Sequence, residues 1–188
     1  MSISEKADEI KSIWSSRETL KLDELTSLAS KIINCWNLGG KLAFCGNGGS
    51  AAEASHLAAE FVGKCVIAHD PWPALCLNES TASLTAISND FGFDQVLLRQ
   101  SKALLREGDL IIGLSTSGVS ENVLRVLEDS HNRGIHSILW TSEKLRRPKP
   151  KWLDEVWIAP TSSTPRAQEI HLTWGHLLSE IIEETLCQ

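Results

Sequence analysis

Short apolar runs alternate with amphipathic stretches from residue 41 onward. The runs are LAFCG, ALCLN, LIIGLS, SILWT and EVWIA. Between them, apolar residues return at helical spacing near residues 50–62, 80–88, 93–106 and 119–133. Near-continuous apolar strands separated by helices are typical of a parallel sheet that is covered on both faces. The pattern therefore predicts an α/β fold with a five-stranded, doubly wound parallel sheet.

Helical patterns also flank this region at both ends. Two helices are predicted before it, at residues 4–15 and 21–37, and a long helix is predicted after it, at about 165–186. No repeat or linker divides the chain. We expect a single domain over residues 1–188, with the leading segment 1–38 packed on the domain or in an oligomer interface.

Composition and charge narrow the range of partners. The 188 residues are 42% apolar and 22% charged, and the formal net charge is -6. A chain without a general basic surface is not expected to bind nucleic acid or an anionic membrane. No apolar stretch approaches the roughly 20 residues that span a bilayer, and the first residues lack the order of a signal peptide. We therefore expect a cytoplasmic protein.

The cysteines are scattered along the chain and never spaced as CxxC. They are Cys35, Cys45, Cys65, Cys76 and Cys187. An odd number at irregular spacing argues against a disulfide framework and against a zinc ribbon. We interpret most of them as thiols of the hydrophobic core.

A basic segment, KLRRPKPKW at residues 144–152, interrupts the alternating pattern. Its two prolines predict a loop. The cations of this loop could contact phosphate, but a solvated surface loop is the favoured interpretation.

The segment GNGGS, residues 46–50, lies directly after a predicted strand and directly before a predicted helix. The free backbone N–H groups and the helix dipole of such a turn form a cradle for an anion or a polyhydroxyl compound. Close packing alone could also require Gly46, Gly48 and Gly49. Both interpretations are open at this point.

A second turn carries several hydroxyl groups. Ser115, Thr116 and Ser117 end a predicted strand, and a helix is predicted to begin near Ser120. Ligands of open parallel sheets bind outside the carboxyl ends of the strands, where hydroxyl and amide donors can hold a phosphate without arginine. Capping of the helix by Ser117 or Ser120 is the alternative, but a cap needs only one hydroxyl. We favour phosphate binding.

Two predicted helices carry groups suited to acid–base chemistry or metal binding. His56 and Glu60 are four residues apart and leave one face of a helix, although a surface pair would show the same spacing. Gln168, His171 and His176 interrupt the apolar final helix. Gln168 and His176 are separated by a rise of roughly 12 Å, so either both reach one centre or a neighbouring subunit completes the site. We expect His171 to be structural.

Taken together, the segments GNGGSAAEASH, SNDFGFD, STSGVSENV and RAQEIHLTWGH resemble the signatures of phosphoheptose isomerases, members of the SIS (sugar isomerase) domain family. The resemblance covers nearly the whole chain. It implies the SIS fold and the conversion of sedoheptulose 7-phosphate to D-glycero-D-manno-heptose 7-phosphate, or a close stereoisomer. It also implies a homotetramer with active sites at subunit interfaces, which serves the biosynthesis of nucleotide-activated heptose.

The resemblance implies roles for individual residues as well. The implied substrate-binding residues are Asn47, Gly48, Gly49, Ser50, Glu60, Asn89, Asp90, Ser115, Thr116, Ser117, Ser120 and Gln168. Glu60 and His176 are implied to be catalytic. One zinc ion per subunit is implied, with His56, Glu60, Gln168 and His176 as its ligands.

Interconversion of a ketose and an aldose moves a proton between two carbons through an enediolate, which requires a base, a proton donor and a group that stabilises the oxyanion. Glu60 would carry the proton and His176 would act on the oxygen, while zinc could act as a Lewis acid. Tight binding to zinc would weaken Glu60 as a base. Two other functions are open: a non-catalytic SIS regulator that binds a protein such as the replication initiator, and a different sugar-phosphate isomerase.

Overall fold

The protein is organised around one sheet of parallel strands. The computed structural model describes residues 2–145 and 148–187. Within them, the strand order is β2-β1-β3-β4-β5. The strands are β1 (Leu42–Gly46), β2 (Ala74–Cys76), β3 (Leu110–Leu114), β4 (His136–Ser142) and β5 (Glu155–Ala159). The predicted five-stranded parallel sheet is confirmed, and each strand coincides with one of the apolar runs.

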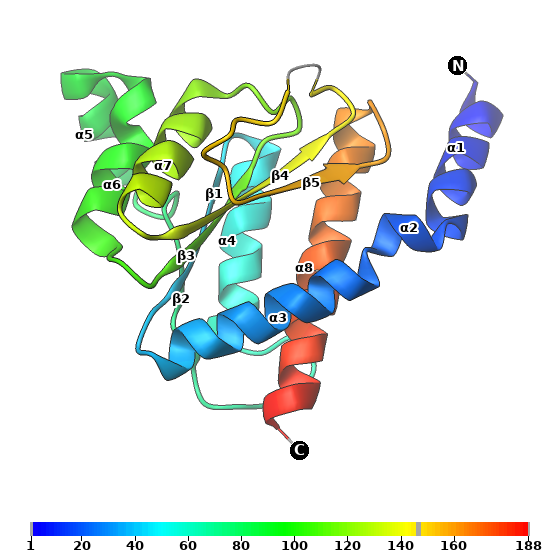
Figure 1. Cartoon of the computed structure of the whole chain (residues 1–188). Coiled ribbons are helices and arrows are strands. Elements are labelled where there is room, and N and C mark those ends of the chain that lie inside the picture. Colours follow the sequence, from blue (N-terminus) through cyan, green and yellow to red (C-terminus); the bar gives the residue numbers. More distant parts are fainter. Residues whose placement is uncertain (1, 146–147, 188) are drawn as a thin grey trace.

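Helices cover both faces of this sheet, with α3, α4 and α8 on one face and α5, α6 and α7 on the other (Figure 1). The helices are α1 (Ile3–Ser15), α2 (Arg17–Leu20), α3 (Leu22–Asn37), α4 (Gly49–Val62), α5 (Thr81–Phe91), α6 (Val96–Leu104), α7 (Glu121–Asn132) and α8 (Thr164–Leu186). The long final helix and the two leading helical segments agree with the sequence-based prediction. None of the described helices is both long and apolar enough to cross a membrane.

Each strand contributes side chains to two hydrophobic cores. Successive side chains of a strand point to opposite faces of the sheet. On β1, Phe44 packs in the core beneath α3, α4 and α8, whereas Cys45 packs in the core beneath α6 and α7. On β3, Ile112 packs in the first of these cores and Ile111 in the second. These four side chains of β1 and β3 are fully buried. Burial on both faces explains why the strand sequences are almost continuously apolar.

The chain continues from β1 to opposite sides of the sheet, and this change of direction determines where a ligand can bind. The chain passes from β1 to β2 on one side and then to β3 on the other side. Gly46 at the end of β1 lies opposite Leu114 at the end of β3. The turns that follow these two strands therefore leave the same edge of the sheet next to each other. Such a switch point is where open α/β sheets bind their ligands.

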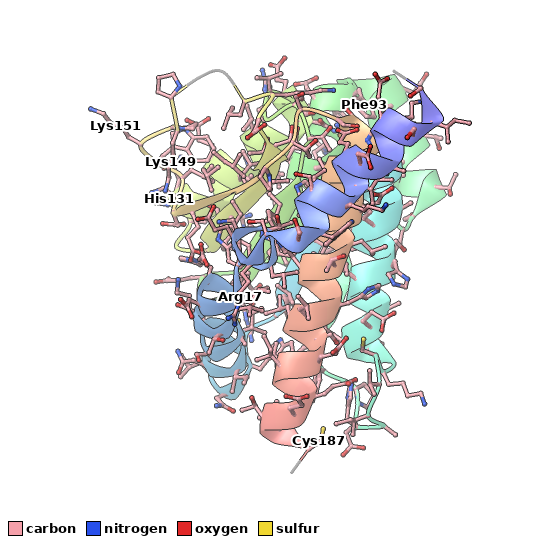
Figure 2. The ribbon with its side chains drawn as sticks, turned by 90° about the vertical axis from the view of Figure 1, so that its right-hand side faces the viewer. Arg17, Phe93, His131, Lys149, Lys151 and Cys187 are labelled. Carbon is pink, nitrogen blue, oxygen red and sulfur yellow. The ribbon has the colours of Figure 1, made fainter. Side chains whose placement is uncertain are left out.

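Of the three described helices that precede β1, α1 and α3 differ in what they bury. α3 places Leu25, Leu28 and Ile32 in the core with no exposed surface. α1 begins with a capping box formed by Ser2 and Glu5 and has no buried residue. Figures 1 and 2 show α1 at the surface, outside the first turns of α8, and a hollow lined by both segments lies between them.

The structure differs from the sequence-based prediction at residues 93–106. A single helix is predicted there, but a short 3-10 turn, η1 (Phe93–Gln95), precedes α6. Gly92 has a φ of 93°, which ends α5 and starts the chain in a new direction. The basic loop is exposed at Lys144 and Lys149, and its two arginines, Arg146 and Arg147, lie outside the described residues.

Candidate active site

The three glycines of the turn between β1 and α4 are needed for different structural reasons. A Cβ atom on Gly46 would lie 2.6 Å from the backbone of Ser50, so close packing requires a glycine there. Gly48 has a φ of 55°, a left-handed conformation that favours glycine. A Cβ atom on Gly49 would overlap the side-chain amide of Gln168. The packing alternative therefore accounts for Gly46, while Gly49 leaves room for a polar side chain from α8.

Two asparagines from outside this turn, Asn122 and Asn78, hold it in place. Asn47 and Asn122 exchange two side-chain hydrogen bonds of 2.8 Å each. The side chain of Asn78 accepts a hydrogen bond from N–H of Gly46 and donates one to its carbonyl, each at 3.0 Å. Asn78 and Asn122 are not among the residues predicted from the sequence to form the site. Asn78 ends the apolar run ALCLN, and a polar residue at the carboxyl end of a strand is the signal that could have identified it.

The hydroxyl groups of the turn between β3 and α7 face one another. Oγ of Ser115 lies 2.9 Å from Oγ of Ser120 and 3.4 Å from Oγ of Ser117. Ser120 is the N-cap residue of α7, but its side chain makes no capping hydrogen bond. The hydroxyl of Ser117 accepts a hydrogen bond from N–H of Val119, which precedes the helix. The alternative that the hydroxyl of Ser117 or Ser120 caps the helix is therefore wrong, and the three serine hydroxyls instead line one pocket.

Three helix N-termini meet at one open pocket with a volume of about 280 Å³. The pocket is lined by Asn47, Gly49, Ser50, Leu114, Ser115, Thr116, Ser117, Ser120, Thr164 and Gln168. α4, α7 and α8 all begin here, and none of the three has a side-chain cap. Their N–H groups are left without helical partners and, together with the helix dipoles, favour a negatively charged ligand. The pocket is therefore suited to an anion even though its lining includes no lysine or arginine.

Four of the residues predicted to bind substrate do not line this pocket. Gly48 lies in the turn next to it, and Glu60 belongs to the group of side chains described below. Asn89 and Asp90 are exposed on α5, where the amide of Asn89 donates to the carboxylate of Asp90 at 2.8 Å. A role of Asn89 and Asp90 in binding substrate stays a prediction.

Three of the four predicted zinc ligands come together between α4 and α8. Nε2 of His56 lies 2.8 Å from Nε2 of His176 and 3.2 Å from Oε1 of Glu60. One ligand atom from each residue lies within 4.8 Å of the other two. Two imidazole nitrogens and a carboxylate oxygen form a donor set that zinc binds in proteins, with a further position open to water or substrate. His56 and Glu60 are thus part of a three-residue cluster, and the donor set fits zinc.

The fourth predicted ligand, Gln168, lies at the other end of the same helix pair. α4 and α8 both start at the carboxyl edge of the sheet and pack side by side as parallel helices (Figure 1). Nε2 of Gln168 lies 3.5 Å from Oγ of Ser50, and Gly175 faces Leu57 so closely that a Cβ atom would overlap it. Gln168 therefore lines the anion pocket, roughly 12 Å along α8 from His176. A metal-binding role for Gln168 stays a prediction.

His171 is fully buried beside Trp140 and Trp174, as expected for a structural histidine. Its Nε2 donates a hydrogen bond of 2.9 Å to the carbonyl of Thr141. Burial lowers the pKa of His171 to about 4, although the bond to Thr141 opposes this shift. The side chain is therefore neutral near pH 7 and ties α8 to β4.

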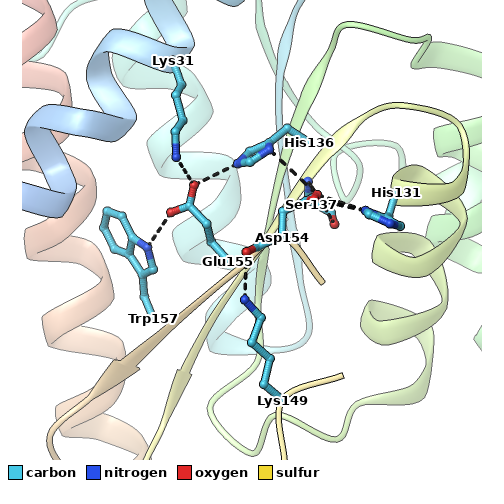
Figure 3. Close-up of polar contacts among 8 residues, drawn as sticks. All are labelled: Lys31, His131, His136, Ser137, Lys149, Asp154, Glu155 and Trp157. Atoms are coloured by element: carbon cyan, nitrogen blue, oxygen red, sulfur yellow. Dashed lines mark hydrogen bonds and ion pairs between the residues drawn. The ribbon is translucent and has the colours of Figure 1, made fainter. Parts of the chain in front are cut away.

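Another polar network lies at the opposite edge of the sheet, where β4 and β5 begin (Figure 3). Glu155 contacts Lys31 and lies 2.9 Å from Nε2 of His136, and it accepts a hydrogen bond of 3.1 Å from the indole of Trp157. The contact with His136 is the largest cause that lowers the pKa of Glu155 to about 2. This network fastens α3 to the edge of the sheet and is remote from the anion pocket.

Two further titratable groups lie near the site: Lys144, a cation of the basic loop for which contact with phosphate was one of two interpretations, and Glu53, which the sequence pattern did not single out. Nζ of Lys144 donates a hydrogen bond of 2.6 Å to Oγ1 of Thr164, which lines the pocket, so the basic loop brings one cation to the rim. Glu53 is buried on α4, between the pocket and His56, and neither of its oxygens has a hydrogen-bond partner among the described residues. Burial raises the pKa of Glu53 to about 8 despite the nearby hydroxyl of Ser50.

Comparison with known proteins identifies the family. The sequence model described as SIS domain matches residues 7–142. A phosphoheptose isomerase of Thermodesulfovibrio yellowstonii is 43% identical over 90% of this chain and 83% of its own length. A phosphoheptose isomerase of Aquifex aeolicus is 40% identical over 90% of this chain and 88% of its own length. The structure of phosphoheptose isomerase GmhA from Neisseria gonorrhoeae matches with a TM-score of 0.82 and 36% identity, covering 97% of this chain and all of that one. Similarity of this extent in sequence and fold means that the chain belongs to the phosphoheptose isomerases of the SIS-domain family.

Proposed function

We propose that this protein converts sedoheptulose 7-phosphate to D-glycero-D-manno-heptose 7-phosphate, or to a close stereoisomer, for the synthesis of nucleotide-activated heptose. The observation that carries the proposal is that an anion pocket and a cluster of acid–base groups lie along one pair of helices. Ser50 in the pocket and His56 in the cluster are six residues apart on α4, a rise of about 9 Å. An extended seven-carbon sugar phosphate spans such a length, with its phosphate in the pocket and its first two carbons at the cluster.

In the proposed mechanism, Glu60 removes a proton from carbon 1 of the ketose and returns it to carbon 2. The electrons of the broken C–H bond form the double bond of an enediol, and their return to carbon 2 gives the aldose. His176 gives a proton to the oxygen on carbon 2 as the enediol forms, and it takes the proton from the oxygen on carbon 1 as the carbonyl of the aldose forms. A carboxylate and an imidazole in contact with one substrate supply the base and the acid that this reaction needs.

We further propose that the protein binds one zinc ion per subunit. His56, Glu60 and His176 would hold the ion, with Gln168 as the predicted fourth ligand. Glu60 would then remove the proton with the carboxylate oxygen that the ion leaves free, and His176 would act through its free ring nitrogen. Bound zinc supplies a Lewis acid that stabilises negative charge on the substrate oxygens. His56 then has no proton-transfer role and serves to orient its two partners.

We propose that the protein acts in the cytoplasm as a homotetramer with active sites at subunit interfaces, without a nucleic-acid or membrane partner. Support for the oligomer comes from large apolar side chains at the surface. Ile3 on α1 is 87% exposed, and Phe91 and Phe93, which follow Asn89 and Asp90 in the sequence, are 52% and 58% exposed. Figure 2 shows Phe93 at the surface. A neighbouring subunit on this face would bury these rings and enclose Asn89 and Asp90 in a shared site.

Two variants test the proposed roles. Glu60→Gln should abolish turnover of sedoheptulose 7-phosphate while binding of the sugar phosphate changes little, because the anion pocket is intact. His176→Ala should behave in the same way. Binding is measured by calorimetry and turnover by formation of the aldose. Substantial turnover in either variant would refute the assigned role of that residue.

A further inference from the structure

A buried carboxylate fastens the segment after α4 to α8. Glu183 on α8 has no exposed surface. Its Oε1 accepts a hydrogen bond of 2.7 Å from the backbone N–H of Cys65, and its Oε2 accepts bonds of 2.9 Å from those of Val66 and Ile67. Three successive amides that converge on one carboxylate form an anion-binding nest. The nest begins two residues after Gly63, where α4 ends.

The carboxylate is held in its charged form. Burial by itself would raise the pKa of Glu183, but the N–H groups of Ile67, Cys65 and Val66 outweigh it and lower the pKa below its ordinary value, with help from His69. Nε2 of His69 lies 3.5 Å from the carboxylate. Hydrogen bonds to a charged acceptor are stronger than those between neutral groups. The latch between Glu183 and residues 65–67 is therefore a strong restraint.

The latch acts on the two helices that carry the reactive cluster. Glu183 follows His176 by seven residues, which places both side chains on one face of α8 about two turns apart. The nest on the other side follows Glu60 by five residues. At the opposite end of the helix pair, Gln168 contacts Ser50 across the anion pocket. The cluster thus lies between two polar contacts, and only the one at Glu183 involves a buried charge.

We propose that Glu183 is a positioning residue that keeps α4 and α8 at the separation at which His56 and Glu60 meet His176. It does not contact the substrate and acts through the backbone of residues 65–67. The proposal rests on the proposed function, because the cluster is taken to be the reactive site. A metal site tolerates only small displacements of its ligands, so loss of the latch weakens metal binding as well as turnover.

The test compares Glu183→Gln with Glu184→Gln, a substitution of the exposed neighbouring residue. Zinc chloride is titrated into each metal-free protein by calorimetry, and circular dichroism confirms that each is folded. Glu183→Gln should bind zinc about tenfold more weakly or worse. Its kcat should fall while its KM changes little, because the pocket at the other end of the helix pair is unaltered. Glu184→Gln should match the wild type in all three quantities.

A folded Glu183→Gln protein with wild-type zinc affinity would overturn the proposal, as would an equal loss in Glu184→Gln. If Glu183→Gln does not fold, hydrogen exchange of the wild type gives the answer. Because coupling between two sites is reciprocal, zinc must slow exchange at the amides of residues 65–67, and unchanged exchange would overturn the proposal. A wild type that binds zinc without isomerising sedoheptulose 7-phosphate refutes the proposed function alone, since the zinc comparison still tests Glu183.

Discussion

Glu53 is a buried acid whose charge is poorly stabilised, and its replacement by glutamine should stabilise the protein at alkaline pH. The residue is 9% exposed, and burial raises the pKa of its carboxyl to about 8 from an ordinary value of 4.5. Below pH 4.5 the carboxyl is protonated in the folded and the unfolded chain alike. Between pH 4.5 and 8 the unfolded chain releases the proton and the folded chain keeps it. The free energy of unfolding therefore falls as pH rises through this window.

The size of the effect follows from the shift. One pKa unit corresponds to about 1.4 kcal/mol, so the rise from 4.5 to about 8 costs about 3 to 5 kcal/mol of stability at pH 9. Glu53→Gln retains the shape of the neutral acid and cannot ionise. Its gain in stability over the wild type should be about 1 kcal/mol or less at pH 5 and should increase to about 3 to 5 kcal/mol at pH 9.

Urea unfolding at several pH values between 5 and 9 measures this difference. Glu184→Gln, which removes an exposed carboxyl, is the control and should show no such trend. A difference between Glu53→Gln and the wild type that stays constant across the range would mean that Glu53 titrates in the folded protein as it does in the unfolded chain, contrary to this prediction.

Three further predictions concern the helix pair, the pocket rim and the network at the opposite edge of the sheet. Gly175→Ala should destabilise the protein by about 1–3 kcal/mol in urea unfolding, because the new Cβ overlaps Leu57, and Leu57→Val in the same chain should restore part of the loss. Lys144→Ala should raise the KM for the sugar phosphate about two- to fivefold in steady-state kinetics, whereas Lys149→Ala, which removes a bond to the backbone of Asp154, should not. Glu155 has a pKa of about 2, so its charged form adds stability above pH 4.5 that is lost as pH falls toward 2. Acid unfolding of Glu155→Gln should lack this contribution, and superimposable acid transitions of variant and wild type would contradict it.

The fold could be predicted from the sequence because the pattern of apolar residues within each short segment is enough to identify its strands and helices. A strand buried on both faces, such as β3, must be apolar at nearly every position, and its neighbours in a parallel sheet follow the same pattern. The helix predicted at 93–106 was placed less well, because the backbone conformation at Gly92 depends on how α5 meets η1 and not on apolar spacing.

The residues that line the pocket could be predicted where they lie in a turn directly after a strand. Ser115 and Asn47 end adjacent strands, and the topology of a parallel sheet brings such residues together. Contacts between α4 and α8 could not be predicted in this way, because they join residues more than 110 positions apart. The contact of Gln168 with Ser50 and that of Glu183 with Val66 both depend on the register of the two helices, which only the packed structure defines.

Whether the protein isomerises sedoheptulose 7-phosphate is tested most directly by nuclear magnetic resonance of this substrate in D₂O with the purified protein. Proton transfer by Glu60 predicts that an aldose 7-phosphate appears and that it carries deuterium at carbon 2, because the carboxyl exchanges its proton with solvent during turnover. Absence of any aldose, with or without added zinc, would mean that the protein does not isomerise sedoheptulose 7-phosphate and would favour a regulator that binds a protein partner.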